Sequence, residues 1–167
     1  DLMFRRKSWS QALDLAEQRT RTFGRRRKIL IVSTPRKPPG LSRIEDEFNR
    51  SDRRRLWVTC RHCNEEQVLK WEQVAWPAGA PEQAAYICEH CGVAWSDGDR
   101  RWSVSRGRWI AEAPFRGTAG FHLPSLYSPW VTMADLAKEY EGKKRFPERL
   151  RTFVNLQLGT TYEQGGD

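Results

Sequence analysis

The sequence contains no apolar run that could cross a membrane. Its longest run of aliphatic residues covers only residues 29–32, whereas a membrane-spanning helix needs about 20 apolar residues. It also shows no secretory signal pattern. We therefore predict no membrane association and a reducing compartment, in which cysteines bind metal more readily than they pair as disulfides.

The short motifs of several large enzyme classes are also missing. There is no Gly-x-x-x-x-Gly-Lys-Ser/Thr phosphate loop, no Gly-x-Ser-x-Gly elbow and no His-Glu-x-x-His zinc motif. Acidic residues such as Asp97 and Asp99 occur, but no pattern marks any of them as a paired general acid and base. We expect that this chain alone is not a complete enzyme, and we predict no catalytic residue in it.

Negative charge is scarce relative to positive charge. The sequence holds 29 Lys and Arg residues against 21 Asp and Glu residues, a formal net charge of +8. Clustered cations attract polyanions through long-range steering and counterion release. The alternative is that such runs are ordinary solvated loops and helix ends. Two runs are predicted to bind nucleic acid, and their residues are Arg25, Arg26, Arg27, Lys28, Arg53, Arg54 and Arg55.

Cysteine occurs four times, and the four residues form two Cys-x-x-Cys pairs, Cys60/Cys63 and Cys88/Cys91. Each pair can bind one metal ion from a tight turn, and two pairs complete a tetrahedron, so the spacing predicts a structural Zn²⁺ site. Gly92 directly follows the second pair and supplies a permissive backbone. An iron site, a disulfide pairing and a thioredoxin-like redox site are the less favoured alternatives.

Four thiolates would fill the coordination sphere of a tetrahedral ion. His62 and His90, which lie inside the two pairs, are therefore predicted to be turn residues and not ligands. A closed site leaves no metal-bound water, so the metal is predicted to stabilise the fold and to do no hydrolytic chemistry. His122 lies among apolar residues and is predicted to have a structural role.

Hydrophobic periodicity and turn residues predict the regular elements. Ser8 is expected to cap a helix, and the four consecutive aliphatic residues 29–32 read as a strand buried on both faces, as in parallel sheets. Ser33 and Thr34 would then lie at the carboxyl end of that strand, where open α/β sheets bind ligands, although they also fit a plain exit from a strand. The predicted helices cover residues 9–23, 41–51, 132–140 and 147–156; the predicted strands cover residues 28–35, 56–59, 66–71 and 84–87, with a hairpin arm over residues 102–110.

Several separated stretches, taken in order and spacing, resemble one protein family. They are residues 15–35, 42–63, 86–92, 120–130 and 153–167, the last reading FVNLQLGTTYEQGGD. Together they resemble the GpA-type large subunit of tailed-phage terminases. The resemblance implies a viral DNA-packaging motor with an N-terminal P-loop ATPase and a C-terminal metal-dependent nuclease that cuts DNA concatemers.

The resemblance also implies cofactors and partners. ATP and Mg²⁺ are implied for the parent protein, and its partners would be double-stranded DNA, a small terminase subunit, the portal of the prohead and further copies of itself. Its location would be the cytoplasm of the bacterial host, and its gene would belong to a phage or prophage. By position, Ser33 and Thr34 are similar to a motif that senses the γ-phosphate, which makes them candidate nucleotide-coupling residues.

The Walker and nuclease motifs of that family would lie outside this chain, which is therefore expected to be a middle portion. We predict an α+β fold: the end of a P-loop-type α/β ATPase sheet in residues 1–50, a four-cysteine zinc ribbon with β-hairpin arms in residues 51–112, and a connector with two helices towards a nuclease in residues 113–167. The alternatives are a stand-alone zinc-ribbon module that binds nucleic acid and a zinc-stabilised adaptor between proteins.

Overall fold

The structure is a computed structural model that describes residues 9–162, and the side chains from residue 14 onward. The chain divides into two compact units, Asp1–Ser33 and Thr34–Asp167. In the first unit, helix α1 (Trp9–Arg19) is followed by the 3₁₀ helix η1 (Arg21–Arg26). The predicted first helix is therefore confirmed, while its predicted cap, Ser8, lies outside the described residues.

The predicted buried strand over residues 28–35 is wrong. This stretch forms no strand, and the side chains of Leu30 and Val32 are 87% and 83% exposed. A strand buried on both faces needs partner strands beside it and packed layers on both sides. Within the described part of the chain, no strand pairs with this stretch. Without such partners, the aliphatic run stays extended and exposed.

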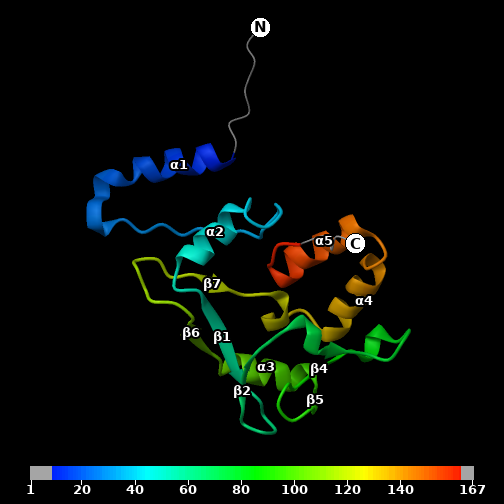
Figure 1. Cartoon of the computed structure of the whole chain (residues 1–167). Coiled ribbons are helices and arrows are strands. Elements are labelled where there is room, and N and C mark those ends of the chain that lie inside the picture. Colours follow the sequence, from blue (N-terminus) through cyan, green and yellow to red (C-terminus); the bar gives the residue numbers. More distant parts are fainter. Residues whose placement is uncertain (1–8, 163–167) are drawn as a thin grey trace. The chain divides into compact units, whose positions relative to one another are not determined.

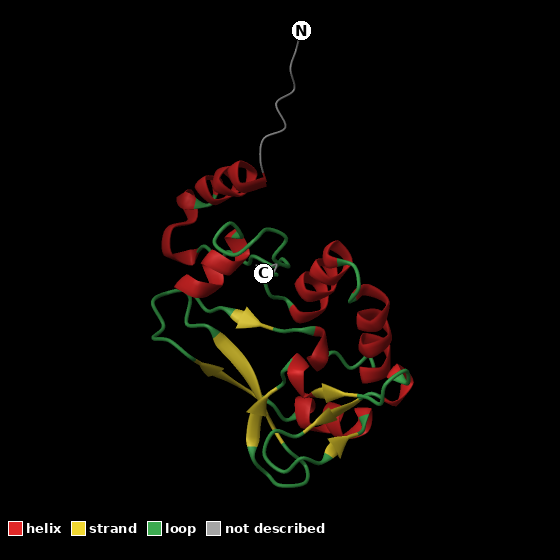
Figure 2. Cartoon of the chain, turned by 45° about the vertical axis from the view of Figure 1, so that its right-hand side comes forward, coloured by secondary structure: helices red, strands yellow, loops and turns green. Residues whose placement is uncertain are grey.

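The second unit contains two small sheets (Figures 1 and 2). In the first sheet, β1 pairs in antiparallel fashion with β2 and β6 and in parallel fashion with β7. In the second sheet, β4 pairs in antiparallel fashion with β3 and β5. The strands are β1 (Arg54–Thr59), β2 (Glu66–Val68), β3 (Val74–Ala75), β4 (Ala85–Ile87), β5 (Ala94–Trp95), β6 (Arg108–Ala111) and β7 (Phe121–His122).

Helices pack around these sheets, so the predicted mixture of helices and strands is confirmed. The described α-helices of this second unit are α2 (Arg43–Arg50), α3 (Asp97–Ser105), α4 (Met133–Lys143) and α5 (Pro147–Phe153). Shorter helical turns are η2 (Trp71–Gln73), η3 (Pro81–Gln83), η4 (Ser125–Tyr127) and the π-helical η5 (Val154–Leu158). None of the described helices is long and apolar enough to span a bilayer.

Helix α3 corrects the predicted hairpin arm over residues 102–110, of which only the end forms a strand. The helix begins with a capping box that the sequence analysis missed. Ser96 Oγ accepts a hydrogen bond from the Asp99 backbone N–H at 3.1 Å, and the Asp99 carboxylate accepts one from the Ser96 backbone N–H at 3.2 Å. These bonds satisfy donors at the first turn that would otherwise lack partners, and they start the helix at residue 97.

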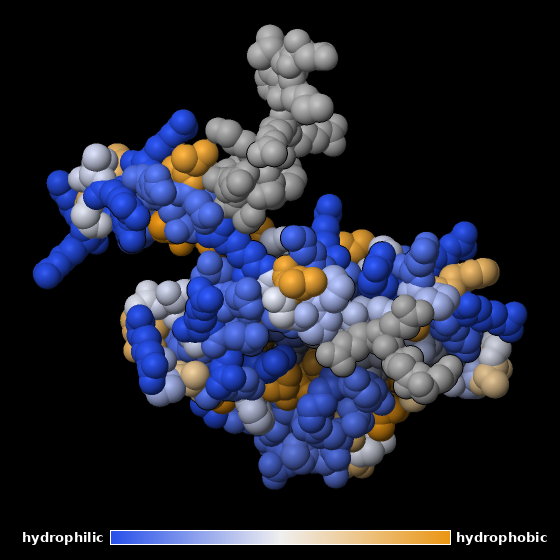
Figure 3. Space-filling view, turned by 45° about the horizontal axis from the view of Figure 1, so that its top comes forward, coloured by the Kyte–Doolittle hydropathy of each residue, from blue (hydrophilic) through white to orange (hydrophobic). Residues whose placement is uncertain are grey.

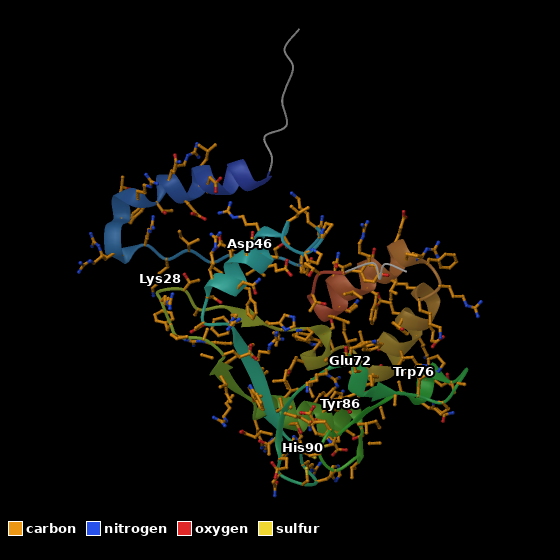
Figure 4. The ribbon with its side chains drawn as sticks, viewed as in Figure 1. Lys28, Asp46, Glu72, Trp76, Tyr86 and His90 are labelled. Carbon is orange, nitrogen blue, oxygen red and sulfur yellow. The ribbon has the colours of Figure 1, made fainter. Side chains whose placement is uncertain are left out.

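One hydrophobic core joins the sheets to the C-terminal helices. An aromatic cluster packs against it: the Trp71 ring lies 5.0 Å from Phe153, 5.3 Å from Tyr140 and 5.9 Å from Trp76, measured between ring centroids. Figure 4 shows Trp76 beside α4 and Tyr86 on the second sheet. Aromatic clusters of this kind bury a large apolar area, so α4 and α5 depend on the side chains beneath them.

A buried arginine fixes α3 against the loop that precedes α4. The Arg100 side chain is 1% exposed. Its Nη1 donates to the carbonyl oxygens of Leu126 at 2.7 Å and Ser128 at 2.8 Å, and its Nη2 donates to that of Val131 at 2.6 Å. The Asp97 carboxylate, 2.9 Å from Nη2, balances the buried charge. The guanidinium therefore donates hydrogen bonds to backbone carbonyls of a loop that makes few backbone–backbone hydrogen bonds of its own.

The first prediction concerns this buried arginine. Arg100→Met should lower the free energy of unfolding by about 3 kcal/mol or more, because it leaves the carbonyls and the Asp97 carboxylate without their buried donor. Urea unfolding followed by Trp fluorescence measures this loss.

The matched control is Arg101→Met, since Arg101 is an exposed neighbour on the same helix. It should change the free energy of unfolding by less than about 0.5 kcal/mol. Equal effects of the two substitutions would contradict the role given to Arg100.

Candidate metal centre

The four cysteines lie on two turns of the same construction. The first turn joins β1 to β2: the Cys60 N–H donates to the Glu65 carbonyl at 2.8 Å, and the Asn64 N–H donates to the Cys60 carbonyl at 3.0 Å. The second turn joins β4 to β5 and repeats this pattern, with Cys88 N–H donating to the Val93 carbonyl at 3.0 Å and Gly92 N–H to the Cys88 carbonyl at 3.0 Å.

Both turns need a left-handed residue directly after the second cysteine. Asn64 has φ 63° and Gly92 has φ 71°. Glycine adopts this conformation without strain, and asparagine tolerates it better than most residues. The choice of these two residues therefore allows each turn to aim both of its sulfurs inward.

The geometry fits a tetrahedral metal ion. All four sulfurs lie within 4.8 Å of one another, and the Sγ atoms are 3.9 Å apart both between Cys60 and Cys91 and between Cys63 and Cys88. Zn–S bonds of about 2.3 Å in a tetrahedron place the sulfurs about 3.8 Å apart. None of the four is in a disulfide. The structure thus brings the four predicted ligands together at metal-binding distances.

A buried glutamine holds one of these sulfurs and was missed by the sequence analysis. Gln67 is 0% exposed. Its Nε2 donates to the Cys88 sulfur at 3.2 Å, while its Oε1 accepts from the Glu89 backbone N–H at 3.1 Å. Gln67 comes from β2, on the first hairpin, and Cys88 from the second, so this side chain fixes one hairpin against the other and also stabilises a thiolate.

Proton affinity differs strongly among the thiols. Burial opposes ionisation of Cys88, but hydrogen bonds from the backbone N–H groups of Cys91 and His90 and from Gln67 outweigh it and lower its pKa to about 6. A backbone hydrogen bond at Glu65 favours the Cys63 thiolate; burial and the neighbouring sulfurs outweigh this bond and raise the pKa of Cys63 to about 12.

Cys91 behaves like Cys63. A backbone hydrogen bond at Val93 favours its thiolate, yet burial and the sulfurs of Cys88 and Cys60 outweigh that bond and raise the pKa of Cys91. Four thiolates this close repel one another, so full ionisation requires a cation among them. The cluster is therefore suited to exchange protons for a metal ion.

The two histidines of the turns lie outside the sulfur cluster, as predicted. His90 Nε2 is 3.2 Å from the Glu66 carbonyl oxygen, and His62 Nε2 is 4.0 Å from a carboxylate oxygen of Asp99. Both residues are exposed, and Figure 4 shows His90 at the end of the unit where the two turns lie. They surround the site without entering the group of candidate ligands.

Two of the three arginines at residues 53–55 bind other side chains of the protein. Arg54 Nε donates to the buried Asp52 carboxylate at 2.8 Å. Arg55 pairs with Glu112 at 3.2 Å, and its Nη1 lies 3.0 Å from His122 Nδ1. Arg53 has φ 50°. The nucleic-acid role of this cluster stays a prediction, and two of its guanidiniums already have structural partners.

The other predicted residues lie at or near the junction of the two units. Arg25 and Arg26 end η1, Arg27 and Lys28 follow it, and all four are exposed. Ser33 is exposed and Thr34 is partly buried, in an extended stretch without a strand. Their proposed nucleotide-coupling role therefore lacks the strand end on which it was based, and it stays a prediction.

Two family models match the chain. The model described as "Phage terminase large subunit gpA, ATPase domain" matches residues 4–109, and "Terminase large subunit gpA, endonuclease domain" matches residues 118–167. The segment predicted as a connector therefore lies mostly within the endonuclease match. The ATPase match includes both cysteine turns, α3 and the start of β6.

Two curated proteins resemble the chain. It is 33% identical over 165 residues to the terminase large subunit of Enterobacteria phage P21, covering 82% of this chain and 25% of that protein. It is 31% identical over 163 residues to the terminase large subunit of Escherichia phage lambda, covering 81% of this chain and 25% of that protein. The chain thus spans about a quarter of the length of these relatives. No solved structure matches.

The second prediction tests the role of Gln67. Gln67→Met keeps the volume but removes both hydrogen bonds, so the affinity for Zn²⁺ should fall by about 10- to 100-fold. Competition with a chromogenic chelator measures this affinity. Gln83→Met, at an exposed position in η3, is the control and should leave it unchanged. Equal affinities for the two variants would contradict the argument.

The third prediction concerns pH. Above pH 6 the thiols of Cys63 and Cys91 still carry protons that the metal must displace, so the apparent Zn²⁺ affinity should rise by about 100-fold or more per pH unit. Below pH 6 Cys88 is protonated as well, so the change in affinity per pH unit should be about tenfold larger than above pH 6. Titrations from pH 5 to 8, corrected for chelator protonation, measure the slope. A change below tenfold per unit across this range would contradict the prediction.

Proposed function

This chain belongs to the gpA family of phage terminase large subunits, and from that premise we propose that it is the part of a DNA-packaging motor that joins the ATPase region to the nuclease region. In this proposal a structural Zn²⁺ ion bound by Cys60, Cys63, Cys88 and Cys91 stabilises the joint. The ion has no catalytic role, because four thiolates leave no position for water.

The observation that carries this proposal is that one sheet contains strands from both matched regions. Strand β7, in the endonuclease match, pairs in parallel fashion with β1, in the ATPase match, with Arg54 opposite Phe121 and Arg55 opposite His122. Backbone pairing of this kind cannot slide without breaking hydrogen bonds. The two regions therefore share a fixed element.

Buried side chains from both matched regions reinforce this element. Arg100, in the ATPase match, binds three carbonyls of the endonuclease match. In the opposite direction, the Tyr127 hydroxyl donates to the Leu56 carbonyl at 2.8 Å and accepts from the Leu69 N–H at 2.8 Å. Burial raises the pKa of Tyr127 to about 12, so the phenol keeps its proton for this bond.

His122 forms a third contact between the two matched regions. Burial and the Arg55 guanidinium lower its pKa, which keeps the ring neutral near pH 7. A neutral ring can accept from Arg55 Nη1 at Nδ1, 3.0 Å away, and donate from Nε2 to the Leu158 carbonyl at 3.0 Å. The ring thus connects β1 to the last helical turn of the unit.

The metal would lie between the two cysteine hairpins, which support these contacts. The hairpins it would hold carry Gln67, Tyr86 and Trp95, each buried to within 1% of complete. Strands of two or three residues cannot remain paired by their own hydrogen bonds, so a metal supplies the stability that a small core lacks. Loss of the metal should then destabilise the elements that pack against these hairpins, including α4.

The activities of the whole motor belong to the proposal as well. The parent protein would hydrolyse ATP with Mg²⁺ to translocate double-stranded DNA through the portal, and would cut concatemers, in the cytoplasm of a bacterial host with a small terminase subunit and further copies of itself. Ser33 and Thr34 would lie towards the nucleotide in that parent. The segment described here would transmit force between the two activities.

The fourth prediction tests the joint by hydrogen exchange of this chain. With Zn²⁺ bound, backbone amides of the cysteine hairpins and of α4 should be protected; after chelation both should lose protection together, because Trp76 of the ribbon contacts Tyr140 and donates from Nε1 to Glu141 at 3.2 Å. Mass spectrometry of peptic peptides resolves these segments.

Helix α1 is the internal control, since it lies in the other compact unit. Its exchange should not respond to the metal. If the hairpins lose protection while α4 keeps it, the ribbon and the nuclease-matched helices are independent, and the proposed joint is refuted. Cys60→Ser should reproduce the chelated state without a chelator.

A further inference from the structure

A hollow of about 880 Å³ lies between the loop before α2, which is in the ATPase match, and the start of α5, which is in the endonuclease match. Its apolar lining includes Pro39, Phe146 and Tyr162, and its basic lining is Arg149 and Arg151. It lies away from the cysteine cluster and contains none of the sequence-predicted site residues. Figure 3 shows that hydrophilic residues dominate the surface around α4 and α5, with apolar groups between them.

The two arginines are available for a ligand. Both are exposed, and neither has a carboxylate within 4.0 Å among the described residues. Arg149 also lines a neighbouring hollow of about 500 Å³ together with Lys138 and Lys143. Positive charge therefore continues from one hollow to the next.

The acidic residues nearby reduce this charge only partly. Glu139 is held by Lys143 at one oxygen and by the Gln157 amide at 2.9 Å at the other. Glu148 lines the larger hollow and is the acid closest in sequence to Arg149. Since the two hollows together are lined by more cationic than acidic side chains, they favour an anionic ligand.

An aromatic ring lies directly under one of the guanidiniums. The Phe146 side chain is 52% exposed, and the Arg149 guanidinium carbon is 4.7 Å from the centre of its ring. A planar guanidinium on an exposed aromatic ring forms a ready stacking platform. Tyr162 and three prolines, Pro38, Pro39 and Pro147, complete the apolar lining beside the arginines.

This combination matches one ligand chemistry. The backbone of a duplex presents phosphates and needs only cations, so an apolar aromatic floor would gain nothing from it. A single strand presents phosphates together with unstacked bases, and aromatic rings beside cations are how proteins bind it. Arginine binds phosphate through two parallel hydrogen bonds. We propose that this hollow, which we name the Phe146 hollow, binds a single-stranded DNA segment, with phosphates on Arg149 and Arg151 and a base against Phe146.

This inference rests on the proposed function, because it gives the nuclease-matched region a place for a locally opened strand. It can nevertheless fail separately. The zinc joint is tested by hydrogen exchange without DNA, whereas the Phe146 hollow is tested by DNA binding with the metal in place.

The fifth prediction uses the zinc-loaded chain and a fluorescently labelled 20-nucleotide single strand. The double variant Arg149→Gln/Arg151→Gln should weaken binding by about tenfold or more, and the slope of log affinity against log salt should become shallower by about 1.4 for two lost phosphate contacts. Phe146→Ala should weaken binding by about fivefold or more with an unchanged slope, because stacking involves no counterion. Fluorescence anisotropy between 50 and 200 mM salt gives both quantities.

The matched control is Arg101→Gln/Arg106→Gln, which removes two exposed arginines of the ATPase-matched region. It should leave the affinity within about twofold of the parent chain. Melting temperatures of all variants should agree, since every substituted side chain is exposed. A duplex of the same sequence should bind more weakly than the single strand and should not respond to Phe146→Ala.

Three results would overturn the inference: equal losses in the two double variants, no effect of Phe146→Ala, or tighter binding of the duplex. The first would indicate general attraction of a polyanion by net charge. The second and third results would show that no base binds in the hollow. In each case the zinc joint would still stand on its own test.

Discussion

The contact between the Arg100 guanidinium and the loop before α4 is the interaction on which the rest of the second unit depends. One buried cation satisfies three carbonyls and one carboxylate, and its own charge is in turn stabilised by them. The loop from η4 to α4 contains Pro129 and forms no strand. Without the guanidinium the buried Leu126 carbonyl would lose its donor, as would the partly buried carbonyls of Ser128 and Val131, and folded proteins avoid unsatisfied buried groups. The position of α4 follows from this loop, and that of α5 from α4.

The sulfur cluster imposes a second constraint. The turns place four sulfurs close enough to raise the pKa of Cys63 and Cys91, so the geometry alone opposes full ionisation. A divalent ion reverses that cost and turns four repelling groups into four ligands. Gln67 prepares the cluster by stabilising Cys88 across the two hairpins. In the proposed zinc-bound state the cysteine hairpins would depend on the metal, whereas the loop before α4 depends on Arg100.

The cluster of four candidate ligands was predictable from sequence because two Cys-x-x-Cys pairs encode a local geometry that few other folds use. Helices with strong local signals, such as α2 and α4, were predictable for the same reason. Arg100 and Gln67 were not, because an arginine or glutamine is usually exposed, and only the tertiary fold shows which one is buried. The capping box of Ser96 and Asp99 was a readable signal that the sequence analysis missed. The aliphatic run at residues 29–32 misled it, since a strand depends on partners that a local pattern does not contain.

The same reasoning explains why the boundary between the matched regions is not a hinge. The segment between the two matches, residues 110–117, is mostly exposed and looks like a linker by sequence. A linker permits motion only if few contacts cross it. Here β7 returns to pair with β1, and Arg100, Tyr127 and His122 each bond across the boundary, His122 through Arg55. A force applied on one side must therefore break several buried polar contacts before the other side can move independently. That is the mechanical property that a joint between two coupled activities requires.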